Sequence, residues 1–333
     1  MQELHIGEND AGQRFDKYLK KLLAEAPGSF VYKMLRKKNI ILNGKKADGT
    51  EKLSCGDEVK LFLSDETYEK LRAKSKTVMP EAFSGSEKTL RQLKVLYEDA
   101  DILIINKPSG MLSQKARPED VSANEYILSY LLREGALTEE EMRTFRPSVC
   151  NRLDRNTSGI LIAGKTLKGL QEMSKALKER TIQKYYRCVV KGEVLREDYL
   201  KGWLVKDERE NKVTVSTVKP KSADAAPIET AYRPIWTGGG YTGLEVHLIT
   251  GRSHQIRAHL ASLGHPIVGD SKYGGVSKVN PSGRTVKYQL LHSYRLEFPK
   301  LAEPFAYLSG RVFEAPMPGY LASVLKETGI RLP

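Results

Sequence analysis

The chain is poor in cysteine and has no long hydrophobic run. Its three cysteines, Cys55, Cys150 and Cys188, lie far apart in 333 residues and form no CxxC pair. They indicate no disulfide framework, so we expect a reducing compartment. The N-terminus has no apolar signal core, and no stretch is long and apolar enough to span a bilayer. We therefore expect a cytoplasmic protein with no membrane partner.

Motifs of metal enzymes and serine hydrolases are missing too. The six histidines show neither an HExxH motif nor zinc-ligand spacing, and no serine lies in a GxSxG turn. His254, His259 and His265 have a side chain that binds metals, but no cysteine or carboxylate lies near them at regular spacing. Hydrogen-bonding or core roles suit them better. We expect a reaction that needs neither a cofactor nor a metal.

Acidic residues are scarce relative to basic ones. Lys and Arg total 54 against 41 Asp and Glu, which gives a formal net charge of +13 and a pI near 9.4. This balance favours a polyanionic partner, although general solubility is the simpler interpretation. The placement of the basic residues has to decide between the two.

Residues 12–64 have the pattern of a small α+β module. Apolar side chains at helical spacing predict a first helix that ends before Pro27-Gly28. Ser29 is placed to cap a second helix. Strands are predicted at 40–42 and 59–63, because short apolar runs there are bounded by turn residues.

A basic cluster without any acid lies within this module. Its members are Lys33, Arg36, Lys37, Lys38, Lys45 and Lys46. Helical spacing puts Lys33, Arg36 and Lys37 on one face. A solvated face is the simpler interpretation, but the lack of compensating acids favours RNA phosphate contacts by Lys33, Arg36, Lys37 and Lys38.

The rest of the chain predicts a linker and a larger domain. Residues 65–90 are polar and poor in large apolar side chains, as in a linker. Beyond residue 91, apolar strands come in pairs, with a hairpin at 93–108 and helices at 122–134 and after the Thr250-Gly251 turn. This pattern predicts an α+β domain with a mixed, mainly antiparallel sheet.

Three polar segments lie beside predicted strands of this domain. They are residues 152–158, 184–186 and 251–259. In the first, Asp154 lies near Arg152 and Arg155, and nearby positive charge keeps a carboxylate ionised. By itself Asp154 could be a turn former, a salt-bridge partner or a nucleophile. Together the segments contain a carboxylate, arginines and a tyrosine, which make a usable acid–base set.

Several motifs resemble those of the RluA-type pseudouridine synthases and occur in the same order. They are INKPSG (105–110), RLDRNTSG (152–159), QKYYRCVVKG (183–192), TGRSHQIRAHLASLGHPIVGDSKYG (250–274) and LLHSYRLEF (290–298). The long 250–274 match is highly specific. The first module, with RFDKYL, YKMLRKKNIILNGKK and CGDEVKL, resembles the RNA-binding domain of ribosomal protein S4.

The resemblance implies an architecture and a substrate. It implies an S4-like RNA-binding domain at 1–64, a linker at 65–90 and a pseudouridine synthase domain at 91–330. The branch with both domains modifies large-subunit (23S) ribosomal RNA, so the implied partner is that RNA or its precursor particles. We expect a monomer.

The resemblance also implies roles for single residues. Asp154 matches the catalytic aspartate and Tyr186 the active-site tyrosine. Arg257 matches the arginine that pairs with the aspartate, with Arg252 as the second candidate. Further RNA-contacting positions are expected at Lys107, Arg152, Arg252 and His254. Two segments depart from the family pattern: Asn151 and Gln114-Lys115 stand where the family often has histidine, which bears on base placement rather than chemistry.

The implied reaction is an isomerisation. The N1–C1′ bond of a flipped-out uridine breaks, the uracil turns, and it is rejoined through C5. Asp154 could attack C1′ or take a proton from C2′ so that a glycal forms, and both routes stay open. Tyr186 could stack on the uracil or take the C5 proton.

Two other function classes remain possible on sequence grounds. One is a non-catalytic RNA-binding ribosome-assembly factor on the same fold. The other is a hydrolase of the glycosidic bond, which would usually use a pair of carboxylates. The joint presence of Asp154, Tyr186 and Arg257 favours the synthase over both.

Overall fold

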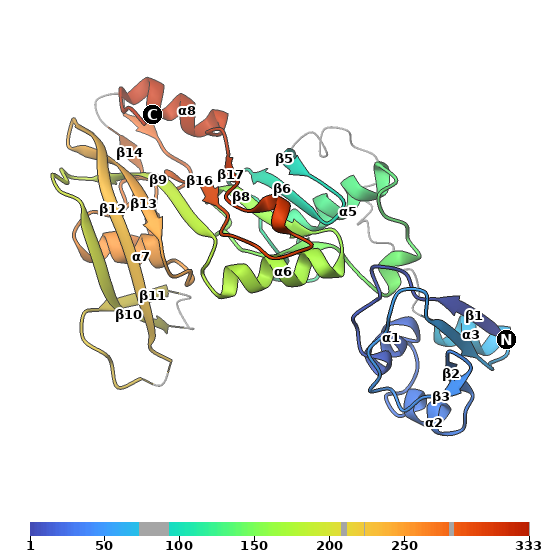
Figure 1. Ribbon diagram of the computed structural model, residues 1–333. Helices are drawn as coiled ribbons and strands as arrows, with labels where there is room; N and C mark the ends of the chain where they lie inside the picture. The colour runs from blue at the N-terminus through green and yellow to red at the C-terminus, as the bar shows by residue number, and fades with distance from the viewer. Residues whose placement is uncertain (73–92, 208–211, 223, 280–282, 333) are drawn as a thin grey trace.

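The computed structural model describes residues 1–72, 93–207, 212–222, 224–279 and 283–332. Figure 1 shows a small unit near the N-terminus, drawn in blue, and a larger unit that holds the rest of the described chain. Within the described residues, no helix combines the length and the apolar character needed to cross a membrane.

The small unit packs helices on a four-stranded sheet. Its elements are β1 (Gln2–His5), α1 (Phe15–Leu22), α2 (Phe30–Arg36), β2 (Ile40–Leu42), β3 (Lys45–Lys46), β4 (Glu58–Leu61) and α3 (Asp65–Leu71). The strand order is β1-β4-β2-β3. Phe15 and Leu19 of α1 and Leu35 of α2 are among its most buried side chains, which confirms the predicted apolar faces.

Three features of this unit differ from expectation. The edge strand β1 was not predicted. Ser29 precedes α2 but makes no capping hydrogen bond through its side chain. Residues 65–71, expected to begin the linker, form α3 instead, because Tyr68 finds an apolar site in the core of the unit. Most of the remaining expected linker, residues 73–90, lies outside the described part of the chain.

The larger unit is built on one long sheet. Its elements are β5 (Lys94–Glu98), β6 (Ile102–Lys107), α5 (Ala123–Arg133), η2 (Glu141–Arg143), β7 (Ser148–Val149), β8 (Ser158–Gly164), α6 (Leu167–Lys178), β9 (Gln183–Lys191), β10 (Asp198–Asp207), β11 (Lys212–Ser216), β12 (Ala226–Gly238), β13 (Tyr241–Leu248), α7 (Gln255–Ser262), η3 (Ser271–Tyr273), β14 (Lys278–Val279), β15 (Arg284–Thr285), β16 (Leu291–Glu297), η4 (Ala306–Leu308), β17 (Val312–Glu314) and α8 (Gly319–Thr328). The predicted 93–108 hairpin and the helix after Thr250-Gly251 are confirmed as β5–β6 and α7.

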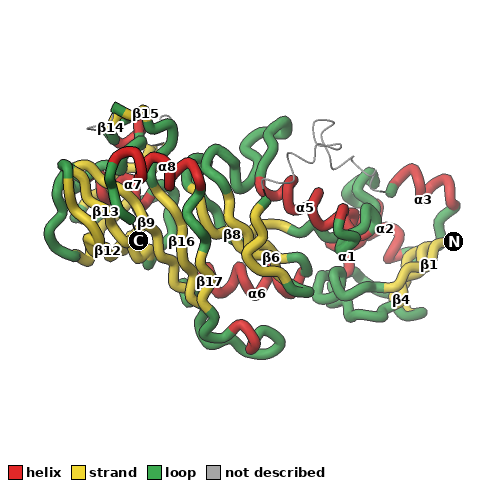
Figure 2. The backbone as a smooth tube through the Cα atoms, turned by 90° about the horizontal axis from the view of Figure 1, so that it is seen from above, coloured by secondary structure: helices red, strands yellow, loops and turns green. Residues whose placement is uncertain are grey.

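The sheet runs in the order β11-β10-β12-β13-β9-β16-β8-β6-β5, with β7 paired to β8 and β17 to β16. Figure 2 shows its central strands side by side from β12 to β6. All described pairs in this sheet are antiparallel except β8 with β16. The expected α+β fold with a mixed, mainly antiparallel sheet is therefore confirmed.

Helices cover both faces of this sheet. Apolar residues of α5 and α7 join one core with side chains of β6, β8, β9 and β13. On the other face, α6 packs over β6 and β8, and α8 contributes to a separate core with Val189 of β9. The two halves of the sheet thus carry different helices and meet at β16.

The join between β8 and β16 depends on a glycine. Only two residue pairs make the parallel contact, Ser158 with His292 and Gly159 with Ser293. Gly159 has a φ of +120°, and a Cβ added to it would lie 2.1 Å from the Ser293 carbonyl oxygen. A larger residue would therefore push the two halves of the sheet apart.

Gly159→Ala should lower the free energy of unfolding by about 3 kcal/mol or more, because backbone strain adds to a steric clash in a packed core. Gly239→Ala is the matched control. Gly239 also has a positive φ, +60°, but an added Cβ would meet nothing within 4 Å. It should cost only about 1 kcal/mol. If denaturant unfolding shows that both variants lose the same free energy of unfolding, the close approach at Gly159 does not contribute to stability.

Candidate active site

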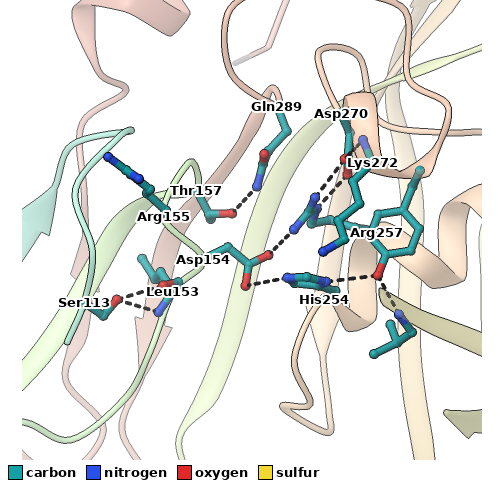
Figure 3. A network of polar contacts seen from close by, with 12 residues as sticks. Ser113, Leu153, Asp154, Arg155, Thr157, His254, Arg257, Asp270, Lys272 and Gln289 are labelled. Atoms are coloured by element: carbon teal, nitrogen blue, oxygen red, sulfur yellow. Dashed lines mark hydrogen bonds and ion pairs between the residues drawn. The ribbon is translucent and has the colours of Figure 1, made fainter. Parts of the chain in front are cut away.

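Asp154 lies in the loop between β7 and β8, and hydrogen bonds fix the chain around it. The Leu153 N–H donates to the Ser113 hydroxyl at 3.0 Å, and that hydroxyl donates to the Leu153 carbonyl at 2.8 Å. The Thr157 N–H donates to the Asp154 carbonyl at 3.0 Å, and Gln289 donates to the Thr157 hydroxyl at 3.0 Å (Figure 3). The backbone that carries Asp154 is therefore held on both sides.

Arg257, on α7, joins Asp154 to a second carboxylate. Its Nη1 donates to Asp154 Oδ2 at 2.8 Å, while Nε and Nη2 donate to the two oxygens of Asp270 at 2.6 and 2.8 Å (Figure 3). The side chains of Arg257 and Asp270 are 8% and 1% exposed, but Asp154 keeps 26%. Asp154 is thus the accessible end of a buried ionic network.

The charges of this network support one another. Burial alone would lower the pKa of Arg257, but the hydrogen bonds and charges of Asp270 and Asp154 outweigh it and raise that pKa above its ordinary value. A permanently charged guanidinium thus lies at hydrogen-bond distance of Asp154. The structure pairs Asp154 with Arg257, as expected, and not with the alternative Arg252.

His254 is the second residue beside Asp154. Its Nε2 lies 3.9 Å from Asp154 Oδ1, and its Nδ1 lies 3.0 Å from the Tyr273 hydroxyl. Burial lowers the pKa of His254, and although Asp154 raises it, Arg257 and Lys272 lower it further. The ring is therefore neutral at neutral pH. We expected His254 to contact RNA, and the structure places its ring beside Asp154.

Tyr186 lies on β9, in the apolar core beneath the site. Its side chain is 6% exposed and packs in one cluster with Cys188 and Val246. Burial raises the pKa of Tyr186 to about 12, and the charge of Asp154 acts in the same direction. Its hydroxyl therefore keeps its proton at physiological pH.

Lys107, at the end of β6, is fully buried. Its Nζ donates to the carbonyl oxygens of Pro108, Met111 and Arg155 at 3.0, 2.8 and 3.1 Å, which ties the 107–111 turn to the loop of Asp154. Burial lowers the pKa of Lys107 to about 7, and Asp154 partly opposes this. A side chain with no exposed surface cannot contact RNA, so our expectation for Lys107 was wrong.

The other predicted RNA contacts lie on the surface. Arg152 and Arg252 are exposed, as are Lys33, Arg36, Lys37 and Lys38 on and after α2. Asn151 stands where the resemblance led us to expect a histidine, and its side chain hydrogen-bonds the backbone of the sheet. Its side chain donates to the Ile160 carbonyl at 3.2 Å and accepts from the Ile162 N–H at 2.8 Å, both on β8.

Sequence reasoning missed several residues of the site. Asp270 and Tyr273 lie inside the specific 250–274 match, but nothing local shows that they contact α7. Gln255 accepts from Thr250 and from the Arg252 N–H at 2.7 and 3.1 Å. It also donates to β12, so it anchors the start of α7 to the sheet. No local sequence pattern marked Gln255 or Asp270 as part of the site.

Two glycine patterns match phosphate-binding motifs in spacing alone. Residues 159–166 spell GxxxxGKT, but 159–164 form the buried strand β8, and the Lys165 ammonium is paired with Glu98 at 2.6 Å. Residues 238–243 spell GxGxxG, but they connect β12 to β13 and open no helix. Neither pattern forms the loop before a helix that binds a nucleotide.

Hydrogen bonds hold two histidines that lie outside the site. His259 Nδ1 lies 3.2 Å from the Thr230 hydroxyl, and His265 Nδ1 lies 3.1 Å from the Lys191 carbonyl oxygen. Across the residues that the structure describes, no three His, Cys, Asp or Glu side chains gather as a possible metal site.

Comparisons with known proteins show the family of this chain. Residues 101–262 match the model of the RNA pseudouridylate synthase family. The chain is 32% identical to ribosomal large subunit pseudouridine synthase C of Vibrio vulnificus over 82% of this chain and 80% of that protein. The chain belongs to the RNA pseudouridylate synthase family. It is 32% identical to the synthase C of Pasteurella multocida over 90% and 87% of the two chains.

Solved structures agree on the fold of this RNA pseudouridine synthase. Human RNA pseudouridylate synthase domain containing 4 matches with a TM-score of 0.58 over 74% of this chain and 96% of that chain. The sequence identity is 18%, so this likeness bears on the fold alone.

Lys107→Met should lower the free energy of unfolding by about 2–4 kcal/mol, because it removes a buried amine that donates to three backbone carbonyl oxygens and leaves that of Met111 buried without this donor. Lys115→Met is the control. Lys115 is a partly exposed lysine of the same segment, 3.5 Å from Glu125, and its loss should cost less than about 1 kcal/mol. Denaturant unfolding measures this free energy for both variants. If Lys107→Met lowers it by no more than Lys115→Met does, the role of Lys107 as a buried anchor is contradicted.

Proposed function

We propose that this synthase isomerises specific uridines of large-subunit ribosomal RNA to pseudouridine, with Asp154 as the reacting carboxylate. The observation that carries the proposal is the buried Arg257–Asp270 pair, which presents one partly exposed carboxylate, Asp154, to solvent. The substrate follows from relatives that are named ribosomal large subunit pseudouridine synthases. The net charge of +13 suits an RNA partner.

Asp154 is suited to both routes of the reaction. As a nucleophile it bonds to C1′ while the N1–C1′ electrons leave on uracil, and the bond to C5 then releases Asp154. As a base it takes the C2′ proton, so that a glycal forms as uracil leaves, and returns the proton later. Either way the C5 proton is lost and N1 gains one, and no redox cofactor is needed.

We assign Tyr186 to stacking and positioning rather than to removal of the C5 proton. A general base must be deprotonated when it acts, and burial holds the pKa of this phenol at about 12. The ring lies beside the core residues of β13, where its position is fixed by packing. The exposure of Arg152 and Arg252 supports a role for both in holding the displaced backbone of a flipped nucleotide.

The hydrolase alternative meets a specific obstacle. Hydrolysis would need a second working carboxylate. Asp270 is the carboxylate bound to the same arginine, but its side chain is 1% exposed and both oxygens accept from Arg257. It cannot activate a water. The assembly-factor alternative predicts no product at all and is decided by the first experiment below.

We also propose that the synthase works as a cytoplasmic monomer. In support, Asp154 and all the partners described above come from one chain. The S4-like role of the small unit remains a proposal based on its exposed basic residues.

Asp154→Asn should reduce single-turnover pseudouridine formation by about 10⁴-fold or more, because an amide is neither a nucleophile nor a base at this step. Affinity for the RNA should change less than about twofold, since phosphate contacts dominate binding. Asp198→Asn, which changes an exposed aspartate of β10, is the control and should keep full activity. Pseudouridine formation by the Asp154→Asn variant would refute the role of Asp154. If the wild type forms no pseudouridine on any large-subunit RNA fragment, the assembly-factor alternative is favoured.

Neutralising Lys33, Arg36, Lys37 and Lys38 together should make the slope of log affinity against log salt shallower, by roughly one unit per lost phosphate contact. The module should stay folded, because its buried residues Val31, Met34 and Leu35 are unchanged. Neutralising Lys175 and Lys178, two exposed lysines of α6, is the control and should leave the slope unchanged. An unaltered slope in the quadruple variant would mean that this face is ordinary solvated surface.

A further inference from the structure

One short turn supports both neighbours of Asp154. Asp270 caps the 3-10 turn η3, where its side chain accepts from the Lys272 N–H at 3.2 Å, and Tyr273 ends the turn. Asp270 binds Arg257, and the Tyr273 hydroxyl lies 3.0 Å from His254 Nδ1. Arg257 and His254 are in turn the residues that face the two oxygens of Asp154.

The contact between Asp270 and Arg257 determines where the guanidinium points. Two parallel hydrogen bonds from a planar group fix its plane and its direction. With Nε and Nη2 taken by Asp270, Nη1 is left to point at Asp154. Both side chains are buried, so water does not compete for these bonds.

The hydroxyl of Tyr273 lies at hydrogen-bond distance of one nitrogen of His254 and so favours one tautomer of the ring. It accepts the Val213 N–H of β11 at 3.0 Å, and its own hydrogen remains to be donated. Donation to His254 Nδ1 leaves the proton of the neutral ring on Nε2, the nitrogen that faces Asp154. The opposite tautomer would turn a lone pair towards a carboxylate, which is repulsive.

The backbone at His254 points to the same role. His254 precedes α7 with φ 55° and ψ 14°, a left-handed conformation that non-glycine residues rarely adopt. Such an outlier persists only where the surrounding structure holds it, and it occurs most often at functional sites. Here it directs the imidazole between Asp154 and Tyr273.

The turn itself is rigidly packed. A Cβ added to Gly275 would lie 1.9 Å from the Ile267 carbonyl oxygen, and the Gly275 N–H donates to the Asp270 carbonyl at 2.8 Å. Gly269, with a φ of +80°, would place a Cβ 2.3 Å from the Tyr288 carbonyl oxygen. The glycines on both sides of η3 therefore let it approach its neighbours closely and stay in place.

We propose that the turn from Asp270 to Tyr273 is the positioning element of Asp154: Asp270 orients Arg257, Tyr273 orients His254, and two N–H groups flank the reacting carboxylate. His254 Nε2 then moves from 3.9 Å to hydrogen-bond distance of Asp154 Oδ1 when substrate fills the site, as catalytic hydrogen bonds commonly do. This assignment rests on the proposed function of Asp154. It makes Asp270, Tyr273 and His254 positioning residues rather than RNA contacts.

Asp270→Asn should reduce the single-turnover rate by about 100-fold and leave the RNA dissociation constant within about twofold, because the amide nitrogen repels one guanidinium donor and no RNA contact is lost. Asp270→Glu keeps the carboxylate and should recover at least about tenfold of that loss. A change in affinity as large as the change in rate, or no recovery by Asp270→Glu, would overturn the role of Asp270.

The Tyr273 arm is tested by a double-mutant cycle. Tyr273→Phe removes the hydroxyl but keeps the ring that Arg257 lies over at 5.1 Å, and should slow the reaction about tenfold. In a His254→Gln background the same change should have no further effect, because it acts through His254. A full effect in that background would show that Tyr273 acts through β11 instead. Tyr320→Phe, whose hydroxyl also accepts a backbone N–H, is the control and should not alter the rate.

A measurement without RNA separates this proposal from the proposed function. Nitrogen-15 NMR of the histidine side chains, with His254→Gln to assign the signal, should find the His254 proton on Nε2 in the wild type. Tyr273→Phe should shift the ring towards a mixture of tautomers. A proton on Nδ1 in the wild type would overturn the proposal even if the synthase is fully active. If the wild type makes no pseudouridine, the proposed function fails. The tautomer measurement still tests whether Tyr273 orients His254.

Discussion

The ionic chain Asp154–Arg257–Asp270 is the interaction on which the site depends. A buried guanidinium is costly unless carboxylates satisfy its donors, and here two of them do. Asp270 is fully enclosed, so it acts as a fixed anchor, whereas Asp154 keeps an exposed edge. This asymmetry leaves one partly exposed carboxylate next to a permanent positive charge.

The sheet brings the members of that chain together. Asp154 precedes β8, whereas Arg257 and Asp270 follow β13, and the two halves of the sheet meet through β16. The parallel contact between β8 and β16 covers two residue pairs and needs a glycine at 159. Lys107 adds a second tie, since its ammonium holds the Asp154 loop to the end of β6. Small changes at this junction should therefore alter the active site.

Much of the fold and part of the site could be predicted from local patterns. The helices α1, α2 and α7 and the β5–β6 hairpin follow from apolar periodicity and turn residues, and Asp154 and Arg257 from the resemblance of their motifs. The edge strand β1 was missed, because four residues with weak alternation carry little signal. Helix α3 was mistaken for linker, because Tyr68 packs into a core built mostly by residues that lie well before it in the sequence.

The sequence by itself determined the class of chemistry and singled out Asp154 as the candidate carboxylate. Only the tertiary structure decided what the polar residues around it do. Lys107 and His254 are cationic in type, and sequence reasoning assigned both to RNA. Folding buries one among backbone carbonyls and turns the other towards Asp154. The physical reason is that hydrogen-bond partners and burial come from segments distant in sequence, which no local pattern records.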